Sequence, residues 1–199
     1  MNRIITIGRE FGSGGREIGH KIAEKLHIAY YDRAIVNELM KRTELAEDYL
    51  KKMEETGPFP LMTFTTGRSL WSSMNPMLEQ HIDVLSEESE VIMEMAKKSD
   101  CVIVGRRADY VLREMNPLRV FTYADMDYKL ARCRAREKAE EKMTDKKLRQ
   151  EINRMDKNRS EYYAFLTGNK WGDRNNYDLC VNTGTNSIDK IVDGIIAFL

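Results

Sequence analysis

The sequence predicts a three-layer α/β fold, in which helices cover both faces of a parallel sheet of about five strands and further helices form a lid. Three observations predict it. Short apolar runs of strand length recur along the chain, helical patterns separate them, and a glycine-rich loop directly follows the first run. A strand, a loop, a helix and a second strand in succession form a βαβ unit, which favours a parallel sheet. We expect the chain of 199 residues to be one domain, 1–199.

The βαβ unit lies near the amino terminus. Residues 3–7 are largely β-branched and predict a strand, and residues 8–15 contain four glycines and predict a loop. A helix is predicted over about 16–26, where apolar residues recur at helical spacing: Ile18, Ile22, Ala23 and Leu26. A second strand is predicted over 28–31.

The rest of the chain continues the alternation of helices and strands. Residues 34–99 are mostly polar with helical patterning, interrupted at 57–60 and by a threonine-rich stretch at 63–67. A continuous apolar run at 101–104 predicts a buried central strand. The remaining predicted elements follow in chain order: a strand at 119–123, helices at 127–142 and 145–165, a strand at 179–182, and a closing helix with Ser187 as its N-cap.

The composition excludes some partners. Lys plus Arg and Asp plus Glu number 32 each, so no overall field attracts nucleic acid or an anionic membrane. No stretch approaches the roughly 18 apolar residues that a membrane helix needs, and three cysteines without a CxxC pair suit a reducing cytosol. We therefore expect a cytoplasmic protein, with Cys101 and Cys180 as small core residues because both lie in apolar runs.

The glycine loop is the strongest candidate for a binding site. Gly12, Ser13, Gly14 and Gly15 stand between the end of a predicted strand and the start of a predicted helix. Backbone N–H groups and the helix dipole form an anion site there, and glycines let a phosphate approach the backbone closely. The loop is therefore predicted to bind nucleotide phosphates; the alternative is a glycine-rich connection without a ligand.

The loop departs from the ordinary P-loop pattern, GxxxxGK[ST], in which Lys reaches the outer phosphates and Ser/Thr holds magnesium. When Gly14 is aligned with the last glycine, Gly15 takes the lysine position and Arg16 the Ser/Thr position. A guanidinium binds phosphate with a planar fork, so we expect Arg16 to supply the missing cation. Glu17 is the candidate replacement for the magnesium ligand.

Four segments together resemble the cytidylate kinase-like family of P-loop kinases: IITIGREFGSGGREIGHKIAEKL, AYYDRAIV, VIVGRRADYVL and INRMDKNRSEYY. The similarity runs over nearly the whole chain, although 43–86 contributes little. It implies a P-loop NTPase fold, with an acceptor-binding insertion at 33–86 and a lid with flanking helices at 127–175. It also implies phosphorylation of CMP or dCMP by ATP with Mg²⁺, so the expected partners are small nucleotide substrates.

The resemblance further implies an acceptor site. Ordinary cytidylate kinases contact the monophosphate through an Asp-Ser/Thr-Gly element after the second strand, where this chain has Asp32 and Arg33. Their Gly-Arg-Asp element after the third strand is matched here as far as Arg106, with Arg107 in place of the Asp. We expect these four residues at the acceptor site.

Arginines of the predicted lid are candidate catalytic residues, because phosphoryl transfer needs cationic charge around the moving group. Arg132 and Arg136 are four residues apart on one predicted helix and match the lid arginines of the resembled kinases. Asp156 and Arg159 match a stretch that contacts phosphates or the cytidine there, so we expect Asp156 at the acceptor site and Arg159 among the catalytic residues. The alternatives are a solvated charged face for the first pair and a surface ion pair for the second.

Two other functions stay open at this level. The departures at Arg33 and Arg107 leave room for a kinase of another small metabolite on the same fold. The absence of the P-loop lysine leaves room for a nucleotide-binding protein with little catalysis.

Overall fold

The structure is a computed structural model that describes residues 2–43, 45, 76–137 and 142–199. Its centre is a sheet of five strands, all parallel, in the order β2-β3-β1-β4-β5. The strands span Ile4–Arg9 (β1), Ala29–Tyr31 (β2), Cys101–Val104 (β3), Leu118–Tyr123 (β4) and Leu179–Asn182 (β5). The parallel sheet predicted from the sequence is confirmed.

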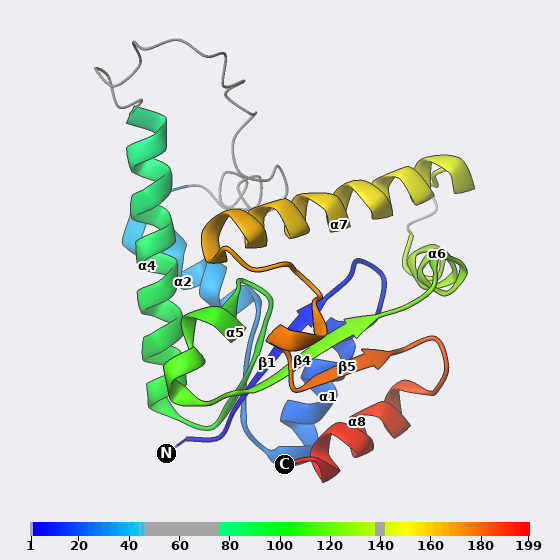
Figure 1. Cartoon of the computed structure of the whole chain (residues 1–199), viewed down its shortest axis with the longest axis horizontal. Coiled ribbons are helices and arrows are strands. Elements are labelled where there is room, and N and C mark those ends of the chain that lie inside the picture. The colour runs from blue at the N-terminus through cyan, green and yellow to red at the C-terminus, as the bar shows by residue number, and fades with distance from the viewer. Residues whose placement is uncertain (1, 44, 46–75, 138–141) are drawn as a thin grey trace.

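Helices connect the strands and cover the sheet (Figure 1). The α-helices of the described ranges are α1 (Gly15–Leu26), α2 (Arg33–Thr43), α4 (Pro76–Lys98), α5 (Ala108–Val111), α6 (Met126–Arg134), α7 (Asp145–Thr167) and α8 (Ile188–Ala197). Short 3₁₀ helices lie at Arg113–Met115 and Arg174–Asn176. None of the helices described here is long and apolar enough to cross a membrane.

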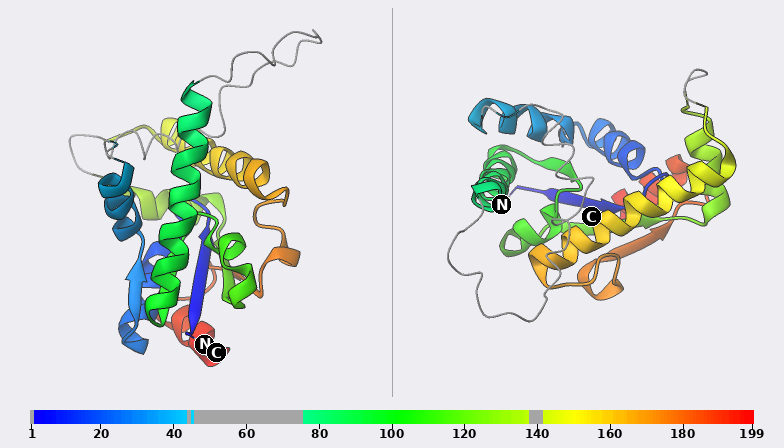
Figure 2. Two further views of the ribbon diagram at one scale, coloured as in Figure 1. Left: turned by 90° about the vertical axis from the view of Figure 1, so that its left-hand side faces the viewer. Right: turned by 90° about the horizontal axis from the view of Figure 1, so that it is seen from above.

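The alternation of side chains along the strands creates two cores. Ile4, Cys101 and Ile103 pack on one face with α2, α4 and α5. Ile5, Val102 and their alternate neighbours pack on the other face with α1 and α8. Successive side chains of a strand point to opposite faces, so fully apolar strands such as β3 require a cover on both sides. Figure 2 shows the resulting layers.

The carboxyl ends of the strands share one edge of the sheet, and α7 runs above this edge (Figure 1). The glycine loop follows β1 there, and the residues after β2 and β3 reach the same edge. Open parallel sheets place their ligands in the crevice outside these ends. This arrangement brings the glycine loop and the segments after β2 and β3 to one edge of the sheet.

Two sequence predictions are wrong. The helix predicted over 127–142 ends at Arg134, and the N–H groups of Arg136 and Glu137 donate to carbonyls three residues back, as in a tightened last turn. The chain then turns toward α7, because Arg134 bonds to Asp145 and Glu137 accepts the backbone N–H of Met143. Cys180 is exposed rather than in the core, because β5 lies at one of the two edges of the sheet. Cys101 is buried as predicted. The interruptions predicted at 57–60 and 63–67 lie outside the described residues, as does much of the insertion predicted at 33–86.

Candidate active site

The glycine loop links β1 to α1 and uses backbone angles that favour glycine. Gly12 and Gly14 have φ values of 78° and 90°, in the left-handed region. Gly14 is also the N-cap of α1, so the first N–H groups of the helix open toward the loop. A Cβ atom added at Gly14 would lie 3.2 Å from the guanidinium carbon of Arg132. The loop thus presents a helix N-terminus directly beside an arginine.

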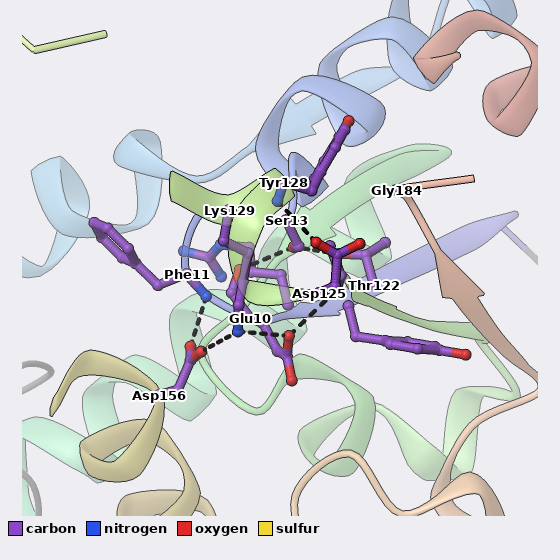
Figure 3. A network of polar contacts seen from close by, with 12 residues as sticks. Glu10, Phe11, Ser13, Thr122, Asp125, Tyr128, Lys129, Asp156 and Gly184 are labelled. Atoms are coloured by element: carbon purple, nitrogen blue, oxygen red, sulfur yellow. Dashed lines mark hydrogen bonds and ion pairs between the residues drawn. The ribbon is translucent and has the colours of Figure 1, made fainter. Parts of the chain in front are cut away.

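Ser13 holds the loop closed rather than lining a cavity. Its side chain is fully buried, and its hydroxyl bonds to the backbone oxygen of Glu10 at 2.9 Å and to the Thr122 hydroxyl at 3.0 Å. The N–H of Glu10 donates to the Thr122 carbonyl at 3.0 Å. Figure 3 shows this group of contacts between the loop and the end of β4. The Ser13 hydroxyl is therefore bonded within the protein rather than turned toward a ligand.

Arg16 and Asp32, which were predicted for the donor and acceptor sites respectively, are in contact. The Arg16 Nε lies 2.8 Å from an Asp32 carboxylate oxygen. The Arg16 side chain is exposed, whereas Asp32 is mostly buried. Arg33 is exposed at the first position of α2. Arg16 thus joins the start of α1 to the segment after β2.

Two lid arginines meet Glu17 of α1. Arg132 and Arg136 donate to the same Glu17 carboxylate oxygen at 2.6 and 2.8 Å. Arg136 lies beyond the end of α6, so the two do not share a helix face as predicted, yet both reach one carboxylate. The hydrogen bond from Arg132 holds the pKa of Glu17 below its ordinary value. The Nε of Arg132 is buried, and within the described ranges it has no hydrogen-bond partner.

A cleft of about 480 Å³ separates the loop from the lid. Its volume is in the range of small-molecule sites. The lining residues that were predicted from the sequence are Gly12, Gly14, Gly15, Arg16, Arg132, Arg136 and Arg159. Arg9 lines the cleft as well, so five of the described arginines and a helix N-terminus surround it, together with the carboxylates of Glu10, Glu137 and Glu151. The excess of arginines over carboxylates suits an anionic ligand.

The arginines after β3 are held by a carboxylate that the sequence analysis did not identify. Arg106 and Arg107 donate to the two oxygens of Glu88 in α4 at 2.5 and 2.6 Å, and all three side chains are buried. Both arginines have left-handed backbone angles, with φ values of 55° and 46°. Such angles cost non-glycine residues ~1–3 kcal/mol each, which indicates that the surrounding contacts determine this turn.

These arginines line a second cavity, of about 60 Å³. Its other charged lining residues are Arg9, Glu88, Asp109 and Arg159. Arg9 and Arg159 line both cavities, and Arg159 donates to the Arg9 carbonyl at 3.3 Å. The guanidinium of Arg159 also lies 5.6 Å from the centre of the Phe11 ring. Arg159 therefore stands at the junction of the two cavities.

Asp156 contacts the glycine loop itself. One carboxylate oxygen accepts the N–H of Phe11 at 2.6 Å, and the other lies 3.0 Å from the Nζ of Lys129. Lys129 also bonds to Glu10 at 2.9 Å (Figure 3). Sequence reasoning missed both Glu10 and Lys129. Glu10 adjoins the glycines and so had a positional signal, whereas Lys129 had none beyond its place in a charged segment.

Comparisons with known proteins agree with this fold. A solved structure of an uncharacterized protein from Eubacterium ventriosum is 29% identical, with a TM-score of 0.70, and covers 98% of this chain and 97% of that one. Shikimate kinase from Bacteroides thetaiotaomicron has a TM-score of 0.60 at 15% identity, covering 100% and 98%. A sugar kinase from Janibacter sp. has a TM-score of 0.57 at 12% identity, covering 99% and 94%. No curated protein sequence matches.

The two kinases are too distant to show more than a common fold. The sequence pattern of the Cytidylate kinase-like family is more informative, because it matches residues 4–185. That span includes the glycine loop, the arginines after β3 and the lid helices. The chain therefore belongs to the cytidylate kinase-like family.

Proposed function

We propose that this protein transfers the γ-phosphoryl group of ATP to a small acceptor, and that the acceptor is CMP or dCMP. The observation that carries the proposal is the cleft between the glycine loop and the lid, where a helix N-terminus faces five arginines of the described ranges. It adjoins a second cavity through Arg9 and Arg159. In-line phosphoryl transfer needs two such neighbouring sites and cationic charge between them.

The donor phosphates bind at the glycine loop in this proposal. The free N–H groups at the start of α1 and the positive end of its dipole attract the phosphates. Arg132 adds a cation beside Gly14. Its buried Nε, which has no hydrogen-bond partner among the described residues, favours an anion at this point because an unsatisfied buried donor is costly. Arg136 and Arg159 complete the cationic ring.

Arg16 is the proposed substitute for the P-loop lysine. It lines the donor cleft, and its exposed side chain bonds to Asp32. A phosphate in the cleft competes with Asp32 for this guanidinium, since both are oxyanions that accept its fork. Arg16 would then exchange a carboxylate partner for a phosphate when ATP binds.

The residues near the loop fit Mg²⁺ that arrives with the nucleotide rather than a dedicated metal cage. Within the described residues, no cluster of three or more His, Cys, Asp or Glu is placed to hold a metal. Glu17, the candidate ligand, is bonded to two arginines. Mg²⁺ in kinases typically uses substrate phosphates, water and one or two carboxylates. When bound, the ion would neutralise phosphate charge, and Glu17 is the carboxylate on α1 nearest that position.

The acceptor is proposed to bind in the second cavity, with Arg106 and Arg107 as its polar contacts. Asp32 and Arg33, which were expected at the same site, are not among the residues that line this cavity, so their acceptor role stays a prediction. At about 60 Å³ the cavity is smaller than a nucleotide, so binding requires its walls to separate. Glu88 already neutralises part of the charge of both buried arginines. Because Glu88 pairs with both arginines, a second candidate for the acceptor is a metabolite that is phosphorylated on a hydroxyl group. Such a molecule would not need two arginines to bind a phosphate of its own.

Measuring ADP formation from ATP and Mg²⁺ against a panel of acceptors tests the proposal. We expect turnover with CMP or dCMP, and none above background with Gly14→Val, because a valine side chain would occupy the space beside Arg132. Turnover only with hydroxyl acceptors would favour the second candidate. ATP binding without turnover on any acceptor would contradict a kinase function.

A further inference from the structure

A buried ammonium group lies on the side of the glycine loop that faces α7 (Figure 3). The Lys129 side chain is only 7% exposed, and its Nζ lies 2.9 Å from a Glu10 oxygen and 3.0 Å from an Asp156 oxygen. Glu10 is the first residue after β1, Lys129 belongs to α6 and Asp156 to α7. One cation thus joins the start of the loop to both lid helices. We call these three residues the loop clamp.

Each carboxylate of the loop clamp also holds a backbone group. Asp156 accepts the N–H of Phe11 at 2.6 Å, and Glu10 accepts the N–H of Ala124 at 3.3 Å. The backbone of Lys129 packs on the loop as well, because a Cβ atom added at Gly12 would lie 3.1 Å from the Lys129 carbonyl oxygen. Contacts from the clamp therefore fix the loop backbone from residue 10 to residue 12.

The charges of the clamp depend on one another. Two partly buried carboxylates share a single ammonium, so removal of the ammonium leaves like charges facing each other at low solvent exposure. Burial raises the pKa of Asp156 even though Phe11 and Lys129 bond to it. Burial by itself lowers the pKa of Lys129, but the bonds to Glu10 and Asp156 outweigh it and leave that pKa raised. Lys129 is therefore charged at neutral pH and is the group that holds the clamp together.

The clamp lies on the helix that also presents an arginine to the loop. Arg132 follows Lys129 by one helical turn in α6 and lines the donor cleft, whereas the cleft lining does not include Lys129. The loop has glycine at the P-loop lysine position. Its affinity for a polyphosphate therefore depends on backbone N–H groups and on arginines from other elements. Small errors in the position of these donors cost binding and rate.

We propose that Lys129 is a positioning residue, which with Glu10 and Asp156 fixes the glycine loop against α6 and α7 so that the loop N–H groups and Arg132 bind the same polyphosphate. The proposal rests on the proposed function, because it explains how the proposed donor site is held in shape. It also reassigns Asp156, which the sequence places with the acceptor contacts, to the donor loop.

The affinity for inorganic tripolyphosphate and for ATP, measured by calorimetry, tests the proposal with Lys129→Met. Tripolyphosphate has no base or ribose, so it reports on the phosphate contacts alone. We expect both affinities to fall by about tenfold or more, a loss typical of misplaced charged donors. Lys157→Met is the matched control, because Lys157 is an exposed residue of α7 with only a 3.7 Å contact to Glu161. It should bind both ligands within about twofold of wild type.

Asp156→Asn is the second variant, because Lys129→Met leaves two carboxylates without their cation and can cost the fold itself. It keeps an acceptor for the Phe11 N–H and leaves Lys129 paired with Glu10. We expect a melting temperature close to wild type, a several-fold weaker affinity for tripolyphosphate and an unchanged KM for the acceptor. If instead the acceptor KM rises and the affinity for tripolyphosphate is unchanged, Asp156 belongs to the acceptor site and the proposal is wrong.

The outcomes separate this inference from the proposed function. If wild type binds tripolyphosphate and a folded Asp156→Asn variant binds it equally well, the clamp has no positioning role. If wild type binds polyphosphate and the variants bind it weakly, the positioning role of the clamp is supported. If no acceptor is phosphorylated in that case, the proposed kinase function alone is wrong. If wild type binds neither ATP nor tripolyphosphate, both are wrong.

Discussion

At the scale of single residues, Gly15 is the position that departs most from an ordinary P-loop. A Cβ atom there would lie 2.6 Å from the Thr122 hydroxyl and 2.7 Å from the Arg9 Cβ, closer than such atoms approach in proteins. Thr122 is fully buried and Arg9 is nearly so, which leaves little room to adjust. The missing lysine is therefore a consequence of packing as well as a change of chemistry.

Restoring the lysine should not restore an ordinary P-loop. We expect Gly15→Lys to lower the free energy of unfolding by ~1–3 kcal/mol, the usual cost of overpacking, and to leave ADP formation no faster. Gly194→Lys in α8 is the control, because a Cβ atom there meets nothing within 4 Å. Chemical unfolding and the ADP assay measure both effects. A stable Gly15→Lys protein with faster turnover would show that the position is free.

At the scale of elements, one buried hydrogen bond ties α7 to the core. The Tyr163 hydroxyl of α7 donates to Asp109 of α5 at 2.6 Å, and both residues are buried. Burial raises the pKa of Asp109 above its ordinary value of 3.8. As pH rises, Asp109 loses its proton in the unfolded chain before it does so in the folded protein. This carboxyl therefore lowers the free energy of unfolding as pH rises from its unfolded pKa to its folded pKa. The bond from Tyr163 limits that loss.

Tyr163→Phe should therefore destabilise the protein most at neutral pH. A hydrogen bond to a charged group contributes ~1.5–3 kcal/mol, so we expect a loss of that size in the free energy of unfolding at pH 7. The loss should shrink as pH falls through the folded pKa of Asp109, because a protonated carboxyl needs the donor less. Tyr123→Phe, at an exposed position of β4, is the control. A loss that is independent of pH would mean that Asp109 does not carry the charge.

At the scale of the whole molecule, the two cavities open from the same edge of the sheet and share Arg9 and Arg159. Arg159 reaches that position because α7 crosses above the carboxyl ends of the strands (Figure 1). In the proposed reaction this is where the transferred phosphoryl group passes between donor and acceptor. A cation there stabilises charge that develops during transfer.

Arg159→Ala should reduce kcat by roughly 10²- to 10³-fold while either KM changes much less. Arg159→Lys should recover part of the rate, because a single ammonium lacks the planar fork of the guanidinium. Arg154→Ala, an exposed position of the same helix paired with Glu151, should keep nearly full activity. Steady-state kinetics with the acceptor found in the panel separates kcat from KM. An effect confined to one KM would place Arg159 in one cavity only.

The sequence by itself determined the local elements and predicts where the proposed donor site lies. The β-branched run at 3–7 predicts a strand, and the continuous apolar run at 101–104 predicts a buried central strand. The glycine pattern with the helix at 16–26 predicts an anion site at the start of α1. Ser187 caps α8 as its position predicts. These features follow from periods of two and 3.6 residues and from turn chemistry, which act between near neighbours in the chain.

Only the tertiary structure decided the partners of the charged residues. Lys129 meets Glu10 across 119 positions in sequence, Arg136 meets Glu17 across the same number, and Glu88 meets Arg106 across 18. No local period predicts such pairs, because a charged side chain has many compatible partners and the fold selects among them by distance and burial. The end of α6 at Arg134 and the exposure of Cys180 have the same origin, since contacts between elements and the position of a strand in the sheet decide them.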